Sequence, residues 1–471
     1  MAISPTPVAK PVIFIEQSLY EVHNKVYPRS VSGIYANARW LMVWFTQLLF
    51  YGLCWLPWHG RQAVLFDLVA RKFYVFGLVF WPQDVIYLAV LLIISAYSLF
   101  LFTAVGGRLW CGYACPQTVY TEIFLWIERK IEGDRAARMK LDSAAMSSRK
   151  VLLRLAKYVA WGLLALWTGF TFVGYFTPIK TLAASVFSFS LGPWETFWII
   201  FYGTFTYIFA GHLREQVCKY MCPYARFQGV MFDPDTLTIT YDAKRGEPRG
   251  GHKKGDDYKA QSKGDCVDCG ICVQVCPTGI DIRKGLQYEC IGCAACIDAC
   301  DQVMEKMSTP KGLIRYSTEH AIASQWGWRE IIGHVIRPRV LIYAVVLWVI
   351  ILAFIWGVAT KPALKVDVIR DRAVLAREVD NGMIENVYRL HLMNVSEHAR
   401  QYELTVRGLP GLTMLPHSAF DLPTEADRTV LVQVQAPPES GKKGTHEIYF
   451  DFKDVSGHEP IISEEAKFFL P

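Results

Sequence analysis

The sequence predicts an integral membrane α-helical bundle of about five spans, joined to a small α+β domain of the dicluster ferredoxin type and to a C-terminal β-sandwich. Three observations predict this fold class. Of the 471 residues, 52% are hydrophobic and only 20% are charged, so the chain is too long and too apolar for one soluble ferredoxin. Two cysteine-rich runs lie close together in the second half of the chain, and alternating apolar and polar residues follow the last apolar stretch.

Five stretches lack Asp, Glu, Lys and Arg over about the length that a bilayer demands. They are residues 40–60, 85–107, 158–179, 196–212 and 340–360, of which 196–212 is the shortest. Residues 63–81 are also apolar, but Asp67, Arg71 and Lys72 interrupt them. We therefore expect residues 63–81 to form an amphipathic helix at the membrane interface.

The distribution of Lys and Arg predicts the orientation. Ten of these residues lie between positions 108 and 157, but only Lys180 lies between 177 and 195. Because basic loops remain in the cytoplasm, the first loop is predicted to be cytoplasmic and the second to lie outside. The first residues do not resemble a cleaved signal peptide, so the first span is expected to serve as an uncleaved anchor.

These spans divide the chain into predicted segments. They are a cytoplasmic N-terminal segment (1–38), a membrane domain with four spans (39–234), a charged linker (235–264), a cytoplasmic ferredoxin domain (265–310), a connector (311–339), a fifth span (340–360) and a periplasmic β domain (361–471). All thirteen Cys lie at or before Cys300, which agrees with thiols in a reducing compartment. The charged, Gly-rich part of the linker is typical of a solvated spacer; a docking strip for an electron donor or anionic lipid is the alternative.

The ferredoxin prediction rests on two copies of a C-x2-C-x2-C-x3-C run, CVDCGICVQVC and CIGCAACIDAC, between residues 266 and 300. This spacing is typical of two 4Fe-4S clusters in which the fourth Cys of each run binds the other cluster. Zinc knuckles are the alternative, but zinc usually takes two separate C-x2-C hooks. We assign one cluster to Cys266, Cys269, Cys272 and Cys300, and the other to Cys290, Cys293, Cys296 and Cys276.

Residues 361–471 contain short alternating runs such as NVYRLHLMNV and THEIYFDFKDV, separated by turn residues. About seven strands in such a segment predict a β-sandwich. Met414 and His417, with His391 and Met393, are possible soft copper ligands in this domain, although scattered Met and His residues are more typical of packing or surface.

A second cysteine pattern, C-x-Y-x-C-P, occurs twice, after the second and after the fourth predicted span. If each motif is helical, the i, i+4 spacing puts both sulfurs on one face. Alternatively the Pro opens a new helix, and residues 116–132 do have an apolar stripe at Val119, Ile123, Ile127 and Ile131. Cys115 would then lie at a helix amino terminus, where the helix dipole lowers the pKa of a thiol.

Two such motifs on one membrane face predict a shared redox or metal site built from Cys111, Cys115, Cys218 and Cys222. Soft thiolates prefer Cu(I) to Cu(II), so copper is one candidate. A third iron-sulfur cluster on these sulfurs is another, and structurally packed thiols are the plain alternative. Cys54 has no partner Cys at useful spacing and is expected to be a packing residue.

Taken together, these motifs resemble the CcoG/FixG/RdxA family of cytochrome c oxidase accessory proteins, which are bacterial membrane polyferredoxins. The resemblance also rests on VYPRSVSGIYANARW, GRQAVLFDLVARKFYVFGLVFWPQD, YDAKRGEPRG and VIRDRAVLAREVDNGMIENVYRLHLMN. It implies an immunoglobulin-like fold for the outer domain, a place in the bacterial inner membrane, and a role in building cbb3-type cytochrome c oxidase.

The resemblance further implies a cupric reductase that supplies Cu(I) to the copper-haem centre, with the four C-x-Y-x-C-P cysteines binding copper or making the last electron step. The oxidase or its copper chaperones would be partners, beside an unknown cytoplasmic electron donor and the lipid bilayer. A homo-oligomer is compatible with the sequence, and nucleic-acid binding is not expected. The alternatives are a quinol-oxidising membrane ferredoxin of the NapH type, which leaves the fifth span and outer domain unexplained, and a non-catalytic assembly scaffold.

Overall fold

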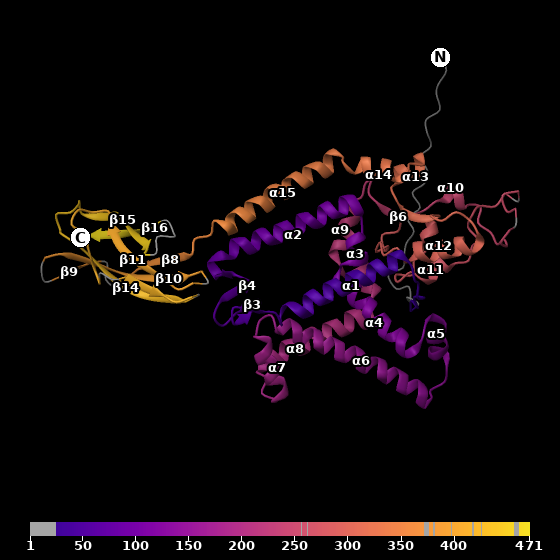
Figure 1. Ribbon diagram of the computed structural model, residues 1–471, viewed down its shortest axis with the longest axis horizontal. Helices are drawn as coiled ribbons and strands as arrows, with labels where there is room; N and C mark the ends of the chain where they lie inside the picture. Colours follow the sequence, from indigo (N-terminus) through magenta and orange to yellow (C-terminus); the bar gives the residue numbers. More distant parts are fainter. Residues whose placement is uncertain are drawn as a thin grey trace, which may run out of the picture.

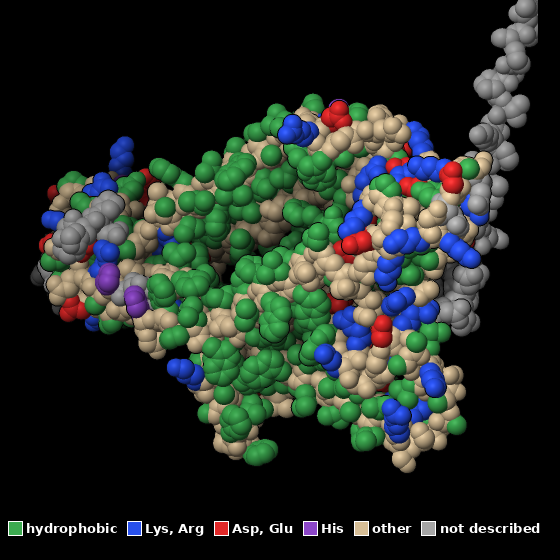
Figure 2. Space-filling view, turned by 45° about the vertical axis from the view of Figure 1, so that its right-hand side comes forward, with side chains coloured by type: hydrophobic (Ala, Val, Ile, Leu, Met, Phe, Trp, Pro, Cys, Tyr) green, Lys and Arg blue, Asp and Glu red, His purple; other side chains and the backbone are tan. Residues whose placement is uncertain are grey.

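The computed structural model describes residues 25–471, except 256, 261, 372–375, 380, 381, 397, 417, 418, 425 and 456–460. Figure 1 shows three parts in succession along the long axis: the cysteine-rich domain at one end, the long helices in the middle, and the β-sandwich at the other end. In Figure 2, hydrophobic side chains cover the middle part, and Lys and Arg side chains gather toward the cysteine-rich end. This distribution is the one expected of a bilayer-embedded middle part.

Three helices in the described residues are long and apolar enough to cross a membrane. They are α2 (Val85–Gly106), α6 (Ser148–Val173) and α15 (Pro338–Ala359), which match three of the five predicted spans. The first predicted span is α1 (Ile34–Leu53), which is interrupted by polar residues such as Arg39 and Gln47. The fourth is α8 (Pro193–Thr206), which continues as a π-helix, η2 (Tyr207–Leu213). Length and composition therefore support three spans, and five remains a prediction.

Residues 63–81 form a small sheet, so the predicted interfacial helix is wrong. Strands β3 (Val64–Asp67), β4 (Lys72–Val75) and β5 (Leu78–Phe80) pair antiparallel in that order. Val79 and Trp81 are buried against Met393 and Val395 of the β-sandwich. The aromatic and β-branched residues of this segment find a packing partner in the β-sandwich, which favours strands over a lipid-facing helix.

Ion pairs also join the β-sandwich to the helices. Asp84, at the start of α2, is only 4% exposed and pairs with Lys361 at 2.8 Å and with Lys365. Gln83 donates to Asp367 at 3.1 Å. A buried carboxylate is stable only when it is paired, so these contacts connect the end of α15 and the first strand of the sandwich to the start of α2.

The cysteine-rich domain contains the helices α11 (Ile271–Gln274) and α12 (Ala295–Met307), the turn η4 (Ile282–Lys284), and the antiparallel strands β6 (Thr238–Tyr241) and β7 (Ile314–Ser317). Asp298 of α12 accepts hydrogen bonds from the backbone N–H groups of Tyr35 (3.2 Å) and Ala36 (2.7 Å). These N–H groups belong to the first turn of α1, which has no intrahelical partners for them. The start of α1 is thus capped by the neighbouring domain.

The C-terminal domain is a β-sandwich, as predicted. One sheet has the order β12-β14-β10-β8 with β9 on β10, and the other has the order β13-β11-β15-β16. The core between the sheets includes Tyr388, Phe450, Phe452 and Phe468. The strands are β8 (Leu364–Arg370), β9 (Arg377–Glu378), β10 (Ile384–Asn394), β11 (Arg400–Arg407), β12 (Thr413–Leu415), β13 (Ala419–Leu422), β14 (Asp427–Ala436), β15 (Gly444–Asp454) and β16 (Ile462–Leu470).

The remaining elements connect these parts. They are β1 (Pro57–Trp58), β2 (Arg61–Gln62), η1 (Pro82–Asp84), α3 (Leu109–Tyr113), α4 (Pro116–Glu132), α5 (Arg135–Ser143), α7 (Ile179–Phe187), η3 (Val217–Met221), α9 (Pro223–Met231), α10 (Ala243–Gly246), α13 (Glu319–Ser324) and α14 (Trp328–Val335).

Candidate redox and metal site

In both C-x-Y-x-C-P motifs the Pro opens a new helix. Pro116 is the first residue of α4 and Pro223 the first of α9, and Cys115 and Cys222 directly precede them in extended conformation. Of the two predicted geometries, the helix-opening proline is therefore the one found. The predicted apolar stripe on α4 is only partly right, because Phe124 and Leu125 are buried in addition to Val119.

The structure brings the four thiols of the two motifs together; we call them the four-thiol site. Burial raises the pKa of Cys111 to about 11, and the nearby thiols of Cys115 and Cys222 add to this shift. Burial raises the pKa of Cys218 to about 12, again with contributions from the other three thiols of the site. Thiols that raise one another's pKa lie within electrostatic reach of one another.

The sequence-based expectation of a lowered pKa at Cys115 is wrong. Burial raises the pKa of Cys115, although the N–H groups of Thr118 and Gln117 at the start of α4 oppose this shift. Desolvation of a thiolate among other sulfurs outweighs the favourable helix terminus. A bound metal cation would instead lower the pKa of Cys115, since metals bind the thiolate form.

Gln228 of α9 contacts the four-thiol site from the side. It is 0% exposed, and its Oε1 accepts a hydrogen bond from the Cys111 thiol at 3.4 Å. Its Nε2 has no hydrogen-bond partner among the described residues. An unpartnered buried donor next to sulfur fits a bound group that offers an acceptor, such as a metal-bound thiolate or an inorganic sulfide. Sequence reasoning missed Gln228; a lone amide in the otherwise apolar stretch FQGVMF was the one available signal.

The ferredoxin cysteines surround two small cavities. Cys266, Cys269, Cys272 and Cys300 line the first, together with apolar residues such as Met304. We call this set cage 1. Cys276, Cys290, Cys293 and Cys296 line the second, which Cys272 also touches; we call these four cysteines cage 2. Each run thus sends its fourth Cys to the other cavity, and the thiol-lined, mostly apolar walls fit an iron-sulfur cluster in each.

In the described part of the chain, no three Cys, His, Asp or Glu side chains converge closely enough to hold a single metal ion. This holds for the four-thiol site as well as for the two cages. A single copper ion on the four-thiol site would therefore draw the thiols closer together.

Cage 2 is in direct backbone contact with the first C-x-Y-x-C-P motif. A Cβ atom added to Gly112 would lie 2.7 Å from the carbonyl oxygen of Gly292, and one added to Gly292 would lie 2.9 Å from that of Arg108. Such distances leave room only for glycine at both positions. Gly292 precedes Cys293 of cage 2, so no solvent layer separates cage 2 from the motif.

Hydrogen bonds hold this contact in place. The Tyr316 hydroxyl donates to the carbonyl oxygen of Gly292 at 2.6 Å and lies 3.4 Å from the hydroxyl of Tyr113, the Tyr of the first motif. Arg108 donates to Ala225 of α9 at 2.6 Å and to Cys290 of cage 2 at 3.3 Å, and Arg39 donates to the carbonyl oxygen of Cys293. The motifs and cage 2 are thereby linked into one rigid unit.

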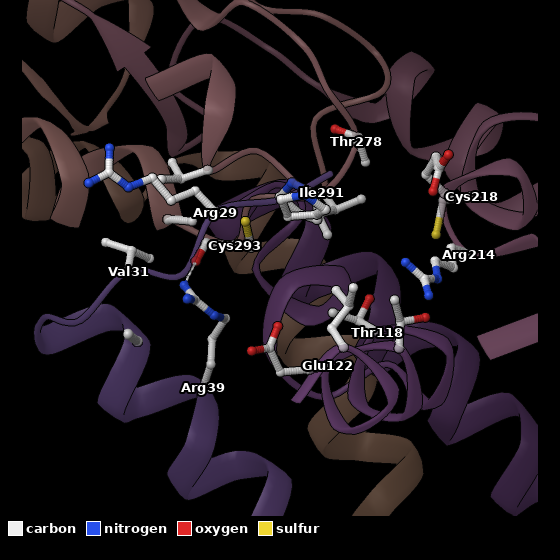
Figure 3. Close-up of a pocket in the computed structure, with 18 of the residues that line it drawn as sticks. Arg29, Val31, Arg39, Thr118, Glu122, Arg214, Cys218, Thr278, Ile291 and Cys293 are labelled. Atoms are coloured by element: carbon white, nitrogen blue, oxygen red, sulfur yellow. Dashed lines mark hydrogen bonds between the residues drawn. The ribbon is translucent and has the colours of Figure 1, made fainter. Parts of the chain in front are cut away.

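Figure 3 shows a cavity between cage 2 and the second motif. Its volume is about 80 Å³. Cys293 lies on one wall, and the Cys218 sulfur points toward Arg214 on the opposite wall. Thr118 and Glu122 of α4 lie between them. Cys218 lines this cavity and is partly exposed.

A buried charge cluster supports the wall that carries Arg214. Glu128 is 1% exposed and pairs with Arg214 at 2.9 Å, Arg138 at 3.1 Å and Lys157 at 3.5 Å. Burial alone would raise the pKa of Glu128, but the three cations hold it below its usual range. The cluster joins α4, α5 and α6 to the residue that follows the π-helix η2.

Other candidate residues do not join a site. Met393 and Met414 are buried in separate apolar clusters, and His391 pairs with Asp427 at 3.3 Å. His417 lies outside the described residues. Cys54 is 0% exposed among apolar side chains, which agrees with a packing role.

Long apolar helices, two cysteine-lined cages and an adjoining thiol site define a membrane-bound iron-sulfur electron-transfer protein. Comparison with known sequences agrees with this class. Residues 213–319 match the family described as 4Fe-4S dicluster domain, residues 88–133 match that described as 4Fe-4S binding domain, and residues 354–471 match the IG-like fold at the C-terminal of FixG.

The chain is 39% identical over 427 residues to the nitrogen fixation protein FixG of Rhizobium meliloti, covering 84% of this chain and 82% of that protein. It is 36% identical over 476 residues to protein RdxA of Cereibacter sphaeroides, covering 96% and 99%. The chain therefore belongs to the FixG/RdxA family. A more distant and partial relative is the ferredoxin-type protein NapH of Haemophilus influenzae, 28% identical over 204 residues, covering 40% of this chain and 66% of that protein.

Proposed function

We propose that this protein reduces Cu(II) to Cu(I) for assembly of the copper-haem centre of a cbb3-type cytochrome c oxidase. The observation that carries the proposal is the four-thiol site packed against the backbone of cage 2 through Gly112. The proposal places the protein in the bacterial inner membrane, with the cages in the cytoplasm and the sandwich in the periplasm. The position of the cages and the sandwich at opposite ends of the long helices supports this orientation (Figure 1).

Two 4Fe-4S clusters, held by the thiolates of cage 1 and cage 2, would supply single electrons at low potential. The chain's own residues do the remaining work. Gly112 and Tyr316 keep cage 2 against the first motif. Thiolates of the four-thiol site stabilise Cu(I) over Cu(II), so each Cu(II) ion takes up one electron and remains bound as Cu(I).

Proton release accompanies copper binding. Burial keeps the thiols of Cys111 and Cys218 protonated, so binding of copper must displace protons from them. The cavity beside Cys218 gives these protons a route to water (Figure 3). Copper uptake by the reduced protein is therefore expected to release protons and to become tighter as the pH rises.

The test is Cu(II) reduction by the purified protein after chemical reduction, followed with a Cu(I)-specific chelator. The key variant replaces Cys111, Cys115, Cys218 and Cys222 together by Ala and must retain wild-type iron at the cages. Cys54→Ala, at a buried cysteine far from the site in sequence, is the matched control. Rapid reduction in wild type and Cys54→Ala that is lost in the quadruple variant supports the proposal; equal rates in all three contradict it.

A third 4Fe-4S cluster on the four-thiol site is the alternative for its occupant. The 4Fe-4S binding match over residues 88–133 includes Cys111 and Cys115, and this favours the alternative. Iron analysis separates the two, because the cages alone would give about eight iron atoms per chain and a third cluster would give about twelve. A difference of about four between wild type and the quadruple variant would assign a cluster to the site.

Quinol oxidation is the second candidate function, and the partial relationship to NapH favours it. It predicts that quinol analogues reduce the clusters in membranes and that the quadruple variant abolishes this reaction. The β-sandwich and α15 would then have no role in the reaction, whereas copper delivery gives the outer domain a place beside the oxidase. A scaffold without redox chemistry predicts that the quadruple variant still assembles oxidase.

A further inference from the structure

The two cages differ in what covers them, and this bears on where electrons enter if the proposed function holds. Cage 2 is covered by α3 and by Tyr316, which donates to the Gly292 carbonyl. Cage 1 instead reaches the surface, where Cys269 is exposed. An electron carrier in solution can therefore approach cage 1 closely, but it meets the membrane domain at cage 2.

A folded loop contacts cage 1 at Cys266. The backbone N–H of Gly250 donates to the carbonyl oxygen of Cys266 at 3.1 Å, and that of Gly264 donates to Pro248 at 2.8 Å. The ring of His252 stacks on Tyr258 with centroids 4.2 Å apart, and the Tyr258 hydroxyl donates to Asp265 at 2.8 Å. The segment predicted as a linker is thus partly a flap that is held against cage 1.

This flap is basic. Residues 242–264 hold seven Lys or Arg against four Asp or Glu. Lys254 and Lys259 are exposed on it, and Lys284 is exposed on the neighbouring turn η4. We define the basic rim as Arg249, Lys253, Lys254, Lys259, Lys263 and Lys284.

Some of the carboxylates beside cage 1 are paired with Arg283. Arg283 lines cage 1, contacts Asp281 at 2.8 Å and also pairs with Asp268, which precedes Cys269. The single Arg283 balances one of these two carboxylates. On the flap, Glu247 pairs with Arg249 at 3.6 Å, and Asp257 is exposed. The flap together with Lys284 therefore carries more positive than negative charge beside cage 1.

The position of the basic rim indicates which of two candidates binds there, an electron donor or an anionic lipid. In Figure 1 the loop that follows α10 lies at the end of the molecule opposite the β-sandwich, beyond the ends of the long helices. Anionic lipid headgroups lie at the level of the helix ends, whereas this loop projects beyond them (Figure 1). We propose that the basic rim is the docking surface for an acidic, low-potential one-electron carrier protein that reduces the protein at cage 1.

The proposed step moves one electron and no atoms. The reduced carrier would lose one electron to a cluster held by the cysteines of cage 1, and the oxidised carrier would leave. Charge attraction at such a surface acts mainly on the association rate and weakens as salt screens it. Both the binding and the rate of reduction should therefore depend on the rim and on ionic strength.

The experiment uses the full-length, cluster-loaded protein in nanodiscs and an acidic ferredoxin as the probe carrier. Its binding in the oxidised form is measured by surface plasmon resonance, and reduction of the clusters by the reduced form is measured by stopped-flow absorbance, each at about 20 and 200 mM salt. The rim variant is Lys254→Glu/Lys259→Glu/Lys284→Glu. The matched control, Lys442→Glu/Lys443→Glu/Lys453→Glu, makes the same charge change at exposed positions of the sandwich.

At low salt, we expect the rim variant to associate with the oxidised carrier at least about tenfold more slowly than wild type, and its clusters to be reduced at least about tenfold more slowly. Both rates of the control variant should stay within about twofold of wild type. Dithionite should reduce all three proteins alike, which shows that the clusters are intact. Equal binding and rates in wild type and the rim variant, or an equal loss in the control, would overturn the docking proposal. If the rim effect holds but the wild type reduces no Cu(II), the docking surface stands and the copper function fails.

Discussion

The two C-x-Y-x-C-P motifs have the same pattern but different surroundings. The first lies on the α-helix α3, and its second residue, Gly112, touches the backbone of cage 2. The second lies on the π-helix η3 and has Lys219 at the position of Gly112. Tyr113 of the first motif bonds to Tyr316, whereas Tyr220 of the second is 50% exposed.

This difference indicates that the two motifs have different roles. Only glycine permits the close approach to cage 2, so the first motif faces the electron source and the second cannot replace it. The π-helical turn of the second motif has poorer backbone hydrogen bonding than an α-helix, and such turns occur often at functional sites. Cys218 on that turn also borders the cavity shown in Figure 3. We therefore expect the first motif to govern electron delivery and the second to govern access of the metal.

The largest effect is expected from Gly112→Val. The added side chain would collide with the Gly292 carbonyl and push cage 2 away, which should lower Cu(II) reduction by roughly tenfold or more while the iron content is kept. Lys219→Val, at the equivalent position of the second motif, should change the rate less than twofold. Steady-state reduction and iron analysis of both variants check this. Equal losses in the two variants would show that the motifs are interchangeable.

The next effect tests the support of the second motif. Glu128→Gln leaves Arg138 and Arg214 buried beside a neutral group, while Lys157 keeps its pair with Glu132 at 2.7 Å, and it should cost about 3 kcal/mol of stability. Because the folded-state pKa of Glu128 is lowered, this contribution is present above the unfolded-state pKa of about 4.3 and is lost as the pH falls through the folded value. Thermal melting at pH 7 and below pH 4 should show the deficit shrinking.

Glu122→Gln is the control for that experiment. Glu122 pairs with Arg129 at 3.2 Å on a more exposed face of α4, where each side chain is 23% exposed. The loss of such a pair should cost less than about 1 kcal/mol. A deficit as large as that of Glu128→Gln would mean that the buried cluster has no special role.

Gln228 should have a smaller effect, confined to the four-thiol site. Gln228→Leu removes the amide beside Cys111, and loss of a group that supports metal ligands typically costs about tenfold in metal affinity. Competition with a Cu(I) chelator measures this affinity. Gln228→Glu tests the role of the unpartnered Nε2 atom, because it retains the acceptor oxygen and removes the donor. If that donor supports the bound group, both variants should lose affinity; wild-type affinity in Gln228→Glu would exclude it.

The smallest effect compares the two tyrosines of the motifs. Tyr113→Phe removes a hydroxyl that interacts with Tyr316, and should cost about 1 kcal/mol. Tyr220→Phe changes an exposed side chain and should stay within about 0.5 kcal/mol of wild type. Thermal melting of the two variants measures the difference. Equal melting temperatures would show that the contact between Tyr113 and Tyr316 is not stabilising.

Patterns that act over a few residues were enough to predict much of this protein. The cysteine spacing predicted two sets of four ligands, and the fold places the same two sets around separate cavities. Runs without charges marked α2, α6 and α15, and alternation marked the β-sandwich. A cluster loop, a span and a strand are each specified by neighbours in the chain, so their signal survives in the sequence alone.

Tertiary packing decided the rest. Residues 63–81 became strands because the sandwich offered an apolar surface at Val79 and Trp81, which no local pattern reveals. The pKa of Cys115 rises because burial desolvates its thiolate and Cys222 lies nearby, which outweighs the N–H groups at the start of its own helix. The contact between Gly112 and Gly292 and the approach of Gln228 to Cys111 join residues more than a hundred positions apart. Burial and long-range contact are properties of the folded chain, so only the structure could assign them.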